Sequence, residues 1–277
     1  MSAAGKVVFV TGSSSGIGRA CCERLSQSGW RVHGGSRSMG APGAWTHHAL
    51  DVRDEHAVNA TVAEVLAREG RIDAVVLSAG YGVTGAVEDI STQEAQALFD
   101  TNYFGVLRVI RAVLPAMRAA GRGRIIVIGS MSSRITLPFL THYSASKSAL
   151  DGLVEGLRLE IAPFGVDAAI LHPGEINTPF AANEINAQAA GPRSPYFAAS
   201  SKTNSFVAEH IGNGLAAEAI AAATEKLLLA SHPPVRKYAG KWVETLAVQT
   251  KLRLPSRLFE RFMRMAYGLE AMPPRGK

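Results

Sequence analysis

Strand-like and helix-like segments alternate along most of this chain of 277 residues. The strand-like segments 73–78 and 124–129 are nearly continuous apolar runs, as in strands that are buried on both faces of a parallel sheet. The alternation predicts an α/β fold, a doubly wound parallel sheet within a single domain over residues 1–277. The predicted strands are 6–10, 31–35, 46–50, 72–78, 124–129, 166–172 and, more weakly, 235–239, and the predicted helices are 17–28, 54–69, 92–119, 141–163 and 216–230.

Two segments depart from this rhythm. Residues 177–214 are rich in Ala, Asn, Pro and Ser, and an insertion of this kind in a compact fold predicts a substrate loop or lid. Residues 241–277 form a basic extension. The chain has a net charge of +6, yet residues 1–231 carry −1 and the last 46 residues carry +7. Because the positive charge belongs to a tail and not to a groove along the fold, we expect no nucleic-acid partner.

The sequence indicates a cytoplasmic location. No apolar run reaches the roughly 18 residues that a membrane-spanning helix needs. Residues 1–5 lead directly into the first predicted strand, without the charged, apolar and cleavage regions of a signal peptide. Cys21 and Cys22 are adjacent in a predicted helix, which suits core packing and not a disulfide framework. The eight histidines show no metal-ligand spacing, so no metal site is expected.

A glycine-rich turn, Thr11-Gly-Ser-Ser-Ser-Gly-Ile-Gly18, joins the first predicted strand to the first predicted helix. Glycine lets the backbone approach a ligand closely, and a helix N-terminus offers unpaired N–H groups to a phosphate. A lone glycine motif is as often an ordinary turn, but doubly wound sheets bind dinucleotides at this first junction. The predicted cofactor contacts of the turn are Gly12, Ser14, Ser15, Gly16, Ile17 and Gly18.

The end of the second predicted strand bears on which dinucleotide binds. An acidic residue there would accept hydrogen bonds from a ribose 2′-hydroxyl, but this chain has Ser36 followed by Arg37. A guanidinium can bind a 2′-phosphate through two N–H groups, and the hydroxyls of Ser14 and Ser15 can donate to the same group. The alternative is that Arg37 is a solvated surface arginine. We favour the first interpretation and predict NADP(H) as the cofactor.

A tyrosine and a lysine lie four residues apart in the predicted helix 141–163. At this spacing Tyr143 and Lys147 project from the same face of the helix. A phenol has an ordinary pKa of about 10, and a nearby cation favours its ionised form, so we expect Lys147 to lower the pKa of Tyr143. Such a pair alone is usually a surface feature. Ser130, which directly follows the strand 124–129, and the glycine turn together favour a catalytic site.

With these motifs the chain resembles the short-chain dehydrogenase/reductase family over about its first 230 residues. The resemblance implies a Rossmann fold and a catalytic tetrad of Asn102, Ser130, Tyr143 and Lys147. Tyr143 and Lys147 would also contact the cofactor. Further implied cofactor contacts are Asp51 and Val52 at the adenine, Ser78, Ala79 and Gly80 after the fourth strand, and Pro173, Gly174, Ile176 and Thr178 near the nicotinamide. The family usually has Asn where this chain has Ser78, which puts local rigidity in doubt.

The resemblance also implies a reaction. In the reductive direction the nicotinamide gives hydride to a carbonyl carbon, Tyr143 donates a proton to the oxygen, and Ser130 hydrogen-bonds that oxygen. Lys147 would also hold the ribose, and Asn102 would support a water in a proton relay. The alternative is a non-catalytic NADP-binding redox sensor. A sensor does not need the four residues in register, so an NADP-dependent oxidoreductase is favoured.

The residues expected around the substrate are apolar. They predict a lipophilic ketone or secondary alcohol, although half of them packing the loop onto the sheet is an equal alternative. Within the family, Tyr81-Gly82, Leu137-Pro138-Phe139 and Arg37 are similar to NADP-dependent carbonyl reductases of the 17β-hydroxysteroid and retinol dehydrogenase type. Steroid-, retinoid- or aryl-ketone-like substrates are implied. The candidate wall residues are Leu137, Pro138, Phe139, Leu140, Pro179, Phe180, Tyr196, Phe197 and Phe206.

Residues 254–267 predict an amphipathic C-terminal helix that begins near Pro255. Arg257, Arg261 and Arg264 fall on one stripe, and Leu258, Phe262 and Met265 fall on another. Three interpretations stay open: a helix that covers the pocket or contacts a subunit, a helix that contacts a membrane surface, and a nucleic-acid role. The family resemblance further implies a homodimer or homotetramer, built through the long helices after Ser91 and Thr141.

Overall fold

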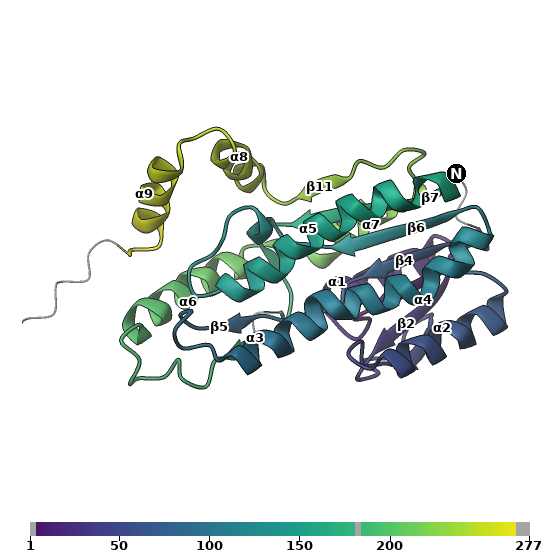
Figure 1. The fold of residues 1–277 in the computed structure, drawn as a ribbon, viewed down its shortest axis with the longest axis horizontal. Coiled ribbons are helices and arrows are strands. Elements are labelled where there is room, and N and C mark those ends of the chain that lie inside the picture. Colours follow the sequence, from purple (N-terminus) through teal and green to yellow (C-terminus); the bar gives the residue numbers. More distant parts are fainter. Residues whose placement is uncertain (1–3, 181–183, 270–277) are drawn as a thin grey trace, which may run out of the picture.

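The computed structural model describes residues 4–180 and 184–269. Seven strands form one parallel sheet in the order β11-β7-β6-β4-β1-β2-β3 (Figure 1). The doubly wound α/β fold predicted from the sequence is therefore confirmed. The strands are β1 (Val7–Thr11), β2 (Arg31–Ser36), β3 (Thr46–Ala49), β4 (Ala74–Leu77), β6 (Gly123–Ile128), β7 (Val166–Pro173) and β11 (Arg236–Ala239).

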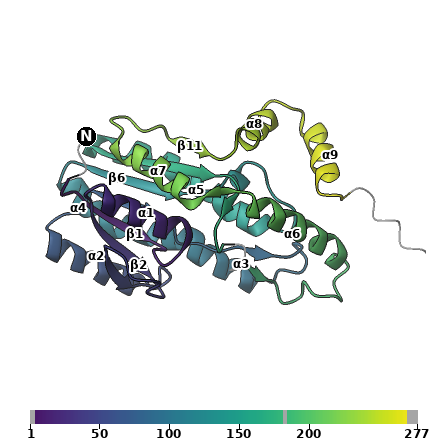
Figure 2. The same ribbon diagram turned by 180° about the vertical axis from the view of Figure 1, so that it is seen from behind.

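Helices cover both faces of the sheet (Figures 1 and 2). One face packs against α2 (Glu55–Glu69), α4 (Gly105–Ala119) and α5 (Thr141–Ile161), and the other against α1 (Gly16–Gln27) and α7 (Ala217–Leu229). Alternate residues of β1 supply the two cores: Val7 and Phe9 face the first layer, and Val8 and Val10 face the second. This double burial explains why the central strands are apolar throughout.

The segment that the sequence predicts as one helix, 92–119, contains a π-helical turn. α3 (Thr92–Phe99) begins with a capping box between Ser91 and Glu94, residues Asp100–Phe104 form the wider turn, and α4 follows. A π-turn inserts one extra residue into the helix and rotates the side chains around it. Here it leaves Asn102 completely buried.

The predicted substrate loop 177–214 contains a helix in its second half, where residues Phe197–Gly212 form α6. Short strand pairs hold the rest of the insertion. β8 (Ile176–Asn177) pairs with β10 (Leu215–Ala216), and β5 (Val83–Thr84) pairs with β9 (Ile185–Asn186). The two ends of the insertion therefore pair with each other, and its first half pairs with the loop after β4.

The C-terminal extension lies apart from the sheet and contains two helices (Figure 1, yellow end). α8 (Trp242–Lys251) is not predicted from the sequence, whereas α9 (Ser256–Ala266), with Pro255 at its N-cap, confirms the amphipathic helix. Residues 270–277 of the extension lie outside the described residues. Among the helices of residues 4–180 and 184–269, none has the length and apolar character that crossing a bilayer requires.

Cys21 and Cys22 lie in α1 and are fully buried in the second core. Burial raises the pKa of Cys21 to about 12 and raises that of Cys22 as well. The thiols therefore keep their protons and pack as small apolar groups.

Candidate active site

The glycine turn between β1 and α1 has no room for side chains. A Cβ atom on Gly12 would lie 2.9 Å from the backbone nitrogen of Ala79, and one on Gly18 would overlap the carbonyl oxygen of Gly12. Gly12 and Gly16 also have positive φ angles of 73° and 54°. Ser15 caps α1 without a side-chain hydrogen bond. The turn thus presents a close, glycine-lined backbone at a helix N-terminus, which fits the pyrophosphate of a dinucleotide.

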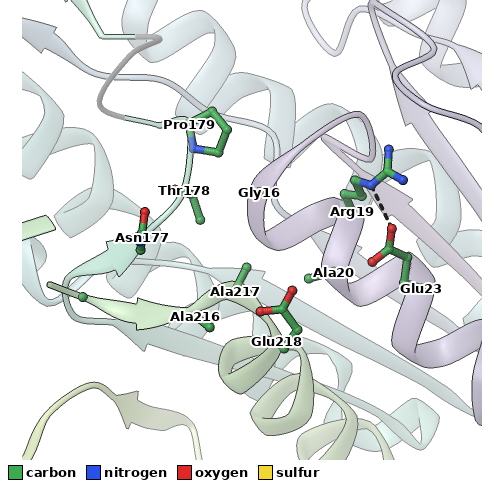
Figure 3. Close-up of a pocket in the computed structure, with 11 residues that line it drawn as sticks. Gly16, Arg19, Ala20, Glu23, Asn177, Thr178, Pro179, Ala216, Ala217 and Glu218 are labelled. Carbon is green, nitrogen blue, oxygen red and sulfur yellow. Dashed lines mark hydrogen bonds and ion pairs between the residues drawn. The ribbon is translucent and has the colours of Figure 1, made fainter. Parts of the chain in front are cut away.

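Thr178 lies opposite this turn. A Cβ atom on Gly16 would meet the Thr178 side chain at 3.6 Å, and the two segments border a cavity of about 320 Å³ that Arg19 and Glu218 also line (Figure 3). None of the four residues of the predicted tetrad lines this cavity. The structure therefore brings the glycine turn and the Thr178 segment together, and both segments line the cavity. Ile17 is half-buried against the second core, and Ile176 is buried in β8.

The Pro173-Gly174 turn is braced from the C-terminal extension. The Glu244 carboxylate on α8 accepts hydrogen bonds from the backbone nitrogens of Glu175 (3.0 Å) and Lys241 (2.6 Å). A Cβ atom on Gly174 would overlap this carboxylate. The N-terminus of α8 is consequently part of the support for this turn, a contact that no local sequence pattern predicts.

The segment Ser78-Ala79-Gly80 after β4 is held by the end of β1. The hydroxyl of Thr11 accepts hydrogen bonds from the backbone nitrogens of Ser78 (3.1 Å) and Ala79 (3.3 Å). A Cβ atom on Gly80 would lie 3.1 Å from Asn102 Oδ1 and 3.6 Å from Lys147 Nζ. The backbone here is therefore supported despite the serine, and Gly80 lies close to two residues of the predicted tetrad.

The end of β2 presents Arg37 to solvent and keeps Ser36 inside. The Ser36 hydroxyl is buried, donates to the carbonyl of Ser38 (2.7 Å), and lies 2.9 Å from His47 Nε2 and 3.2 Å from Ser13 Oγ. Arg37 is exposed. Only Arg37 of the pair is free to reach a cofactor phosphate.

Asp51 lies near Arg37 but is bound to Arg53. It accepts hydrogen bonds from the backbone nitrogen (3.0 Å) and the guanidinium (2.6 Å) of Arg53, which hold the pKa of Asp51 below its usual range, with a smaller contribution from Arg37. Arg53 is a second cation at this edge that the sequence analysis missed. Val52 is buried and packs against Gly105 of α4.

Tyr143 and Lys147 lie side by side on the buried face of α5, as predicted. Their exposed fractions are 9% and 6%, and Lys147 Nζ lies 5.8 Å from the centre of the Tyr143 ring. Lys147 donates a hydrogen bond to the carbonyl of Ile128 (2.9 Å), at the end of β6. Ser130 hydrogen-bonds the Tyr143 side chain and also accepts from the Ser132 hydroxyl (2.9 Å). The structure thus joins Ser130, Tyr143 and Lys147.

The expected lowering of the Tyr143 pKa by Lys147 is wrong for the protein on its own. Burial raises the pKa of Tyr143 to about 12, against the opposing hydrogen bond from Ser130, and Glu184 adds a further upward contribution. Burial also lowers the pKa of Lys147 to about 8. Removal of both groups from water disfavours the charged form of each, and this desolvation is the largest cause of both pKa shifts.

Asn102 holds the backbone of Tyr81. Its Oδ1 accepts from Tyr81 N (3.0 Å), and its Nδ2 donates to Tyr81 O (2.9 Å) and to Ser146 Oγ (3.1 Å). Ser146 in turn donates to the carbonyl of Tyr143 (2.7 Å). The π-turn therefore places the Asn102 side chain where it hydrogen-bonds both the loop after β4 and α5, the helix that carries Tyr143.

An apolar cluster surrounds Tyr143. It contains Leu137, Leu140 and Phe180, which the sequence predicts, and the Phe180 ring centre lies 5.4 Å from that of Tyr143. The other members are Val83, Ile90, Leu98, Ala187, Tyr81, Ala95 and Ala190. Four predicted aromatic residues lie outside this cluster, and Phe139 is one of them. The Tyr196 hydroxyl donates to Glu88 (2.8 Å), Phe197 is 38% exposed, and Phe206 packs edge-on against Tyr267.

A charged network that the sequence analysis missed lies behind Ser130. His172, fully buried at the end of β7, contacts the carbonyl of Ser130 (3.0 Å) and the Asp151 carboxylate (3.1 Å). Asp151 also binds Arg134 (3.2 Å) and Arg236 (3.0 Å). Burial alone would raise the pKa of Asp151, but the hydrogen bonds from His172 and Arg236 bring it to about 2. The network positions the backbone of Ser130.

No group of three His, Cys, Asp or Glu side chains with metal-binding geometry occurs in the part of the chain that the structure describes. The side chains that the structure does bring together are Ser130, Tyr143 and Lys147.

Comparisons with known proteins agree with this geometry. The family model for short chain dehydrogenases matches residues 6–189. A 3-ketodihydrosphingosine reductase from Bacteroides thetaiotaomicron is 32% identical over 265 residues, covering 95% of this chain and 98% of that protein. Human 17-beta-hydroxysteroid dehydrogenase type 1 is 36% identical over 192 residues, covering 63% of this chain and 58% of its own length.

Among solved structures, a short-chain dehydrogenase from Streptomyces avermitilis is 29% identical and superposes with a TM-score of 0.81, covering 96% of this chain and 98% of its own. The fold is thus shared with proteins of one family. The chain belongs to the short-chain dehydrogenases, oxidoreductases that bind a nicotinamide cofactor.

Proposed function

We propose that this protein is an NADPH-dependent carbonyl reductase, reversible as an alcohol dehydrogenase, that acts on an apolar ketone or secondary alcohol. One observation carries the proposal: Tyr143, Lys147 and Ser130 are joined in a buried group that faces an apolar cluster. A hydroxyl group that keeps its proton at neutral pH, set among apolar side chains, suits proton transfer to the oxygen of an apolar ketone.

Each residue has a role in this proposal. The nicotinamide, when bound, supplies or accepts the hydride. Tyr143, with a pKa of about 12, holds the proton that it donates to the developing alkoxide, and the Ser130 hydroxyl donates a hydrogen bond to the same oxygen. Lys147 donates one hydrogen bond to Ile128 and keeps two further N–H groups for the cofactor ribose and for proton resupply. Asn102 supports the backbone on both sides of this relay.

Replacement of Tyr143 by phenylalanine tests the assignment. Because a positioned acid contributes about 10²–10⁴-fold, turnover should fall by that factor, while NADPH binding, followed by its fluorescence, should persist. Tyr103→Phe, a substitution within the π-turn of a side chain that packs against the first core, is the matched control and should keep full turnover. Near-normal turnover of Tyr143→Phe would refute the assigned acid. Tight NADPH binding without reduction of any ketone in a broad panel would favour the redox sensor instead.

The preference for NADP(H) rests on the edge of the sheet at β2. Arg37 is exposed there, and no carboxylate occupies the end of β2 to bind a ribose 2′-hydroxyl. Arg53 adds a second guanidinium next to Asp51. Two guanidinium groups at the expected position of the 2′-phosphate favour the phosphorylated cofactor.

For the substrate, we propose a long-chain keto lipid first and steroid-, retinoid- or aryl-ketone-like compounds second. The apolar cluster around Tyr143 supports any of these. The order follows the relative named for reduction of 3-ketodihydrosphingosine, which is matched over 98% of its length, whereas the human 17-beta-hydroxysteroid dehydrogenase is matched over 58%. A panel that contains 3-ketodihydrosphingosine, a ketosteroid, a retinal and an aryl ketone, with loss of NADPH absorbance as readout, ranks them directly.

We also propose that the C-terminal helices contact an anionic membrane surface, where a lipid substrate would reside. α9 exposes apolar side chains beside a row of arginines, and α8 adds three exposed apolar residues. An apolar face with a basic border is typical of interfacial helices. The exposed apolar residues are Trp242, Val243, Leu246, Leu258, Phe262 and Met265, and the arginines are Arg257, Arg261 and Arg264.

Point substitutions test this contact better than truncation at Lys241, because truncation there would also remove the Glu244 brace. A variant with serine at Leu258, Phe262 and Met265 should lose sedimentation with anionic liposomes and keep its far-UV circular dichroism. Equal sedimentation of variant and parent would remove the membrane proposal. A change of oligomeric state in the variant, without liposome binding by either protein, would assign the helix to a subunit contact.

The oligomeric state and the location are separate proposals. Phe104 (46% exposed) and Leu159 (81% exposed), on the π-turn and on α5, support a homodimer or homotetramer built through these helices. Leu159→Lys should then shift the mass in sedimentation equilibrium towards the monomer, and an unchanged mass would contradict this surface. The cytoplasmic location stays a prediction that imaging of a tagged chain would test.

A further inference from the structure

We propose that Glu184 binds a positively charged amino group of the substrate, next to the carbonyl that Tyr143 protonates. The favoured substrates are then amino ketones with a long or bulky apolar part, and Glu184 is the residue that distinguishes them from neutral ketones. This inference rests on the proposed ketoreductase function and narrows its substrate class.

The backbone at Glu184 is held over the loop that follows β4. Ile185, the next residue, donates its N–H to the carbonyl of Gly82 (3.0 Å) and pairs with Val83. A Cβ atom on Gly82 would lie 3.1 Å from Glu184 Cγ and 3.2 Å from Glu184 Oε1. The absence of a side chain at Gly82 thus makes the space in which the carboxyl group lies.

This carboxyl group lies at the edge of the cluster around Tyr143, because it occupies the space at Gly82 and the preceding residue, Tyr81, packs in that cluster. Its negative charge also contributes to the rise in the pKa of Tyr143. The surroundings are apolar, since Val83, Ala187 and Phe180 belong to the cluster around Tyr143. Its partial burial raises the pKa of Glu184 to about 7.

Neighbouring carboxylates have partners, whereas Glu184 has none among the described residues. Glu94 accepts from the backbone of Ser91 and Gln188, Asp89 accepts from a serine hydroxyl, and Glu88 accepts from a tyrosine hydroxyl. These groups hold the loop in place. A half-buried carboxylate beside a catalytic phenol, without a cation or donor of its own, is unfavourable unless a ligand supplies the counter-charge.

An ammonium group on the substrate interacts favourably with both Glu184 and Tyr143. It pairs with the ionised carboxylate through charge-assisted hydrogen bonds. It also offsets the negative charge that makes Tyr143 a weaker acid, so an amino ketone improves the proton donor that reduces it. A neutral hydroxyl group would do neither as well, because it brings no charge.

The test compares two ketones in the intact protein with its cofactor: 3-ketodihydrosphingosine, which carries an amino group next to the carbonyl, and the same compound without that amino group. Glu184→Gln should lower kcat/KM for the amino ketone by about 10- to 100-fold and change that for the deamino ketone by less than about twofold. Gly82→Ala, which displaces the carboxylate without removing it, should lower only the amino-ketone value. Glu160→Gln, an exposed carboxylate on α5, is the matched control and should change neither.

Two outcomes overturn the inference: an amino-ketone value that is unchanged in Glu184→Gln, or an equal loss for both ketones, which would assign Glu184 to general positioning. A binding measurement tests the role of Glu184 independently of the proposed ketoreductase function. Calorimetry in the presence of NADP⁺ compares dihydrosphingosine, the corresponding amino alcohol, with its deamino analogue. Tighter binding of the amine by the parent and not by Glu184→Gln supports the inference even if no ketone is reduced. Equal binding of both compounds refutes it even if simple ketones are reduced.

Discussion

Replacement of Lys147 by methionine should make the folded protein more stable at neutral pH while it abolishes turnover. The ammonium group is 6% exposed, and burial lowers its pKa from 10.5 to about 8. The unfolded chain therefore binds this proton more tightly than the folded protein does. It follows that the charged lysine destabilises the folded state below about pH 8, and that this cost declines as the pH rises towards 10.5.

The size of the effect follows from the two pKa values. Each tenfold difference in proton affinity corresponds to about 1.4 kcal/mol, so the charged side chain costs about 3 kcal/mol at pH 7. Methionine has a similar volume and removes this cost, but it leaves the carbonyl of Ile128 without its donor, which costs about 1 kcal/mol. The net gain is about 2 kcal/mol at pH 7, or about 4 °C in Tm. At about pH 9.5 most of the destabilisation by the charged lysine is already lost, so the stability gain of Lys147→Met should approach zero.

Urea unfolding followed by far-UV circular dichroism at both pH values measures the gain, and NADPH oxidation measures turnover. Lys226→Met, at an exposed position of α7, is the control and should change stability little at either pH. The reasoning fails if Lys147→Met is less stable than the parent at pH 7, or if the difference between them does not depend on pH.

Three further substitutions probe the site and its support. Gly18→Ala places a methyl group against the carbonyl of Gly12, so NADPH should bind at least about tenfold more weakly in a fluorescence titration, and unchanged binding would contradict the close-approach argument. Arg37→Ala should raise the KM for NADPH by about 10- to 100-fold and leave that for NADH nearly unchanged; equal effects on the two would remove the 2′-phosphate role. Asp151→Asn leaves His172 and Arg134 without their anion and leaves Arg236 paired only with Glu155, so urea unfolding should show a loss of about 3–5 kcal/mol, and a loss below about 1 kcal/mol would show that the network is dispensable.

The strands, most helices and the clustered core of the site follow from local patterns in the sequence. Apolar runs that alternate with helical periods predict the sheet, because strands buried on both faces have few other compositions. The glycine turn and the spacing of Tyr143 and Lys147 predict their contacts for the same kind of reason: the backbone geometry of a turn or helix fixes which neighbours in sequence share a face. The fold class and the Ser130, Tyr143 and Lys147 group were predictable on this basis.

Features that depend on residues far apart in sequence were decided only by the tertiary structure. The π-turn that buries Asn102, the network of His172 and Asp151 behind Ser130, and the approach of Glu184 to Tyr143 each join segments whose local patterns carry no sign of the contact. The pKa of Tyr143 is the clearest case. Sequence spacing shows that a cation lies nearby, but the loss of water around both groups appears only when the sheet, α5 and the insertion pack together, and that desolvation sets the direction of both pKa shifts.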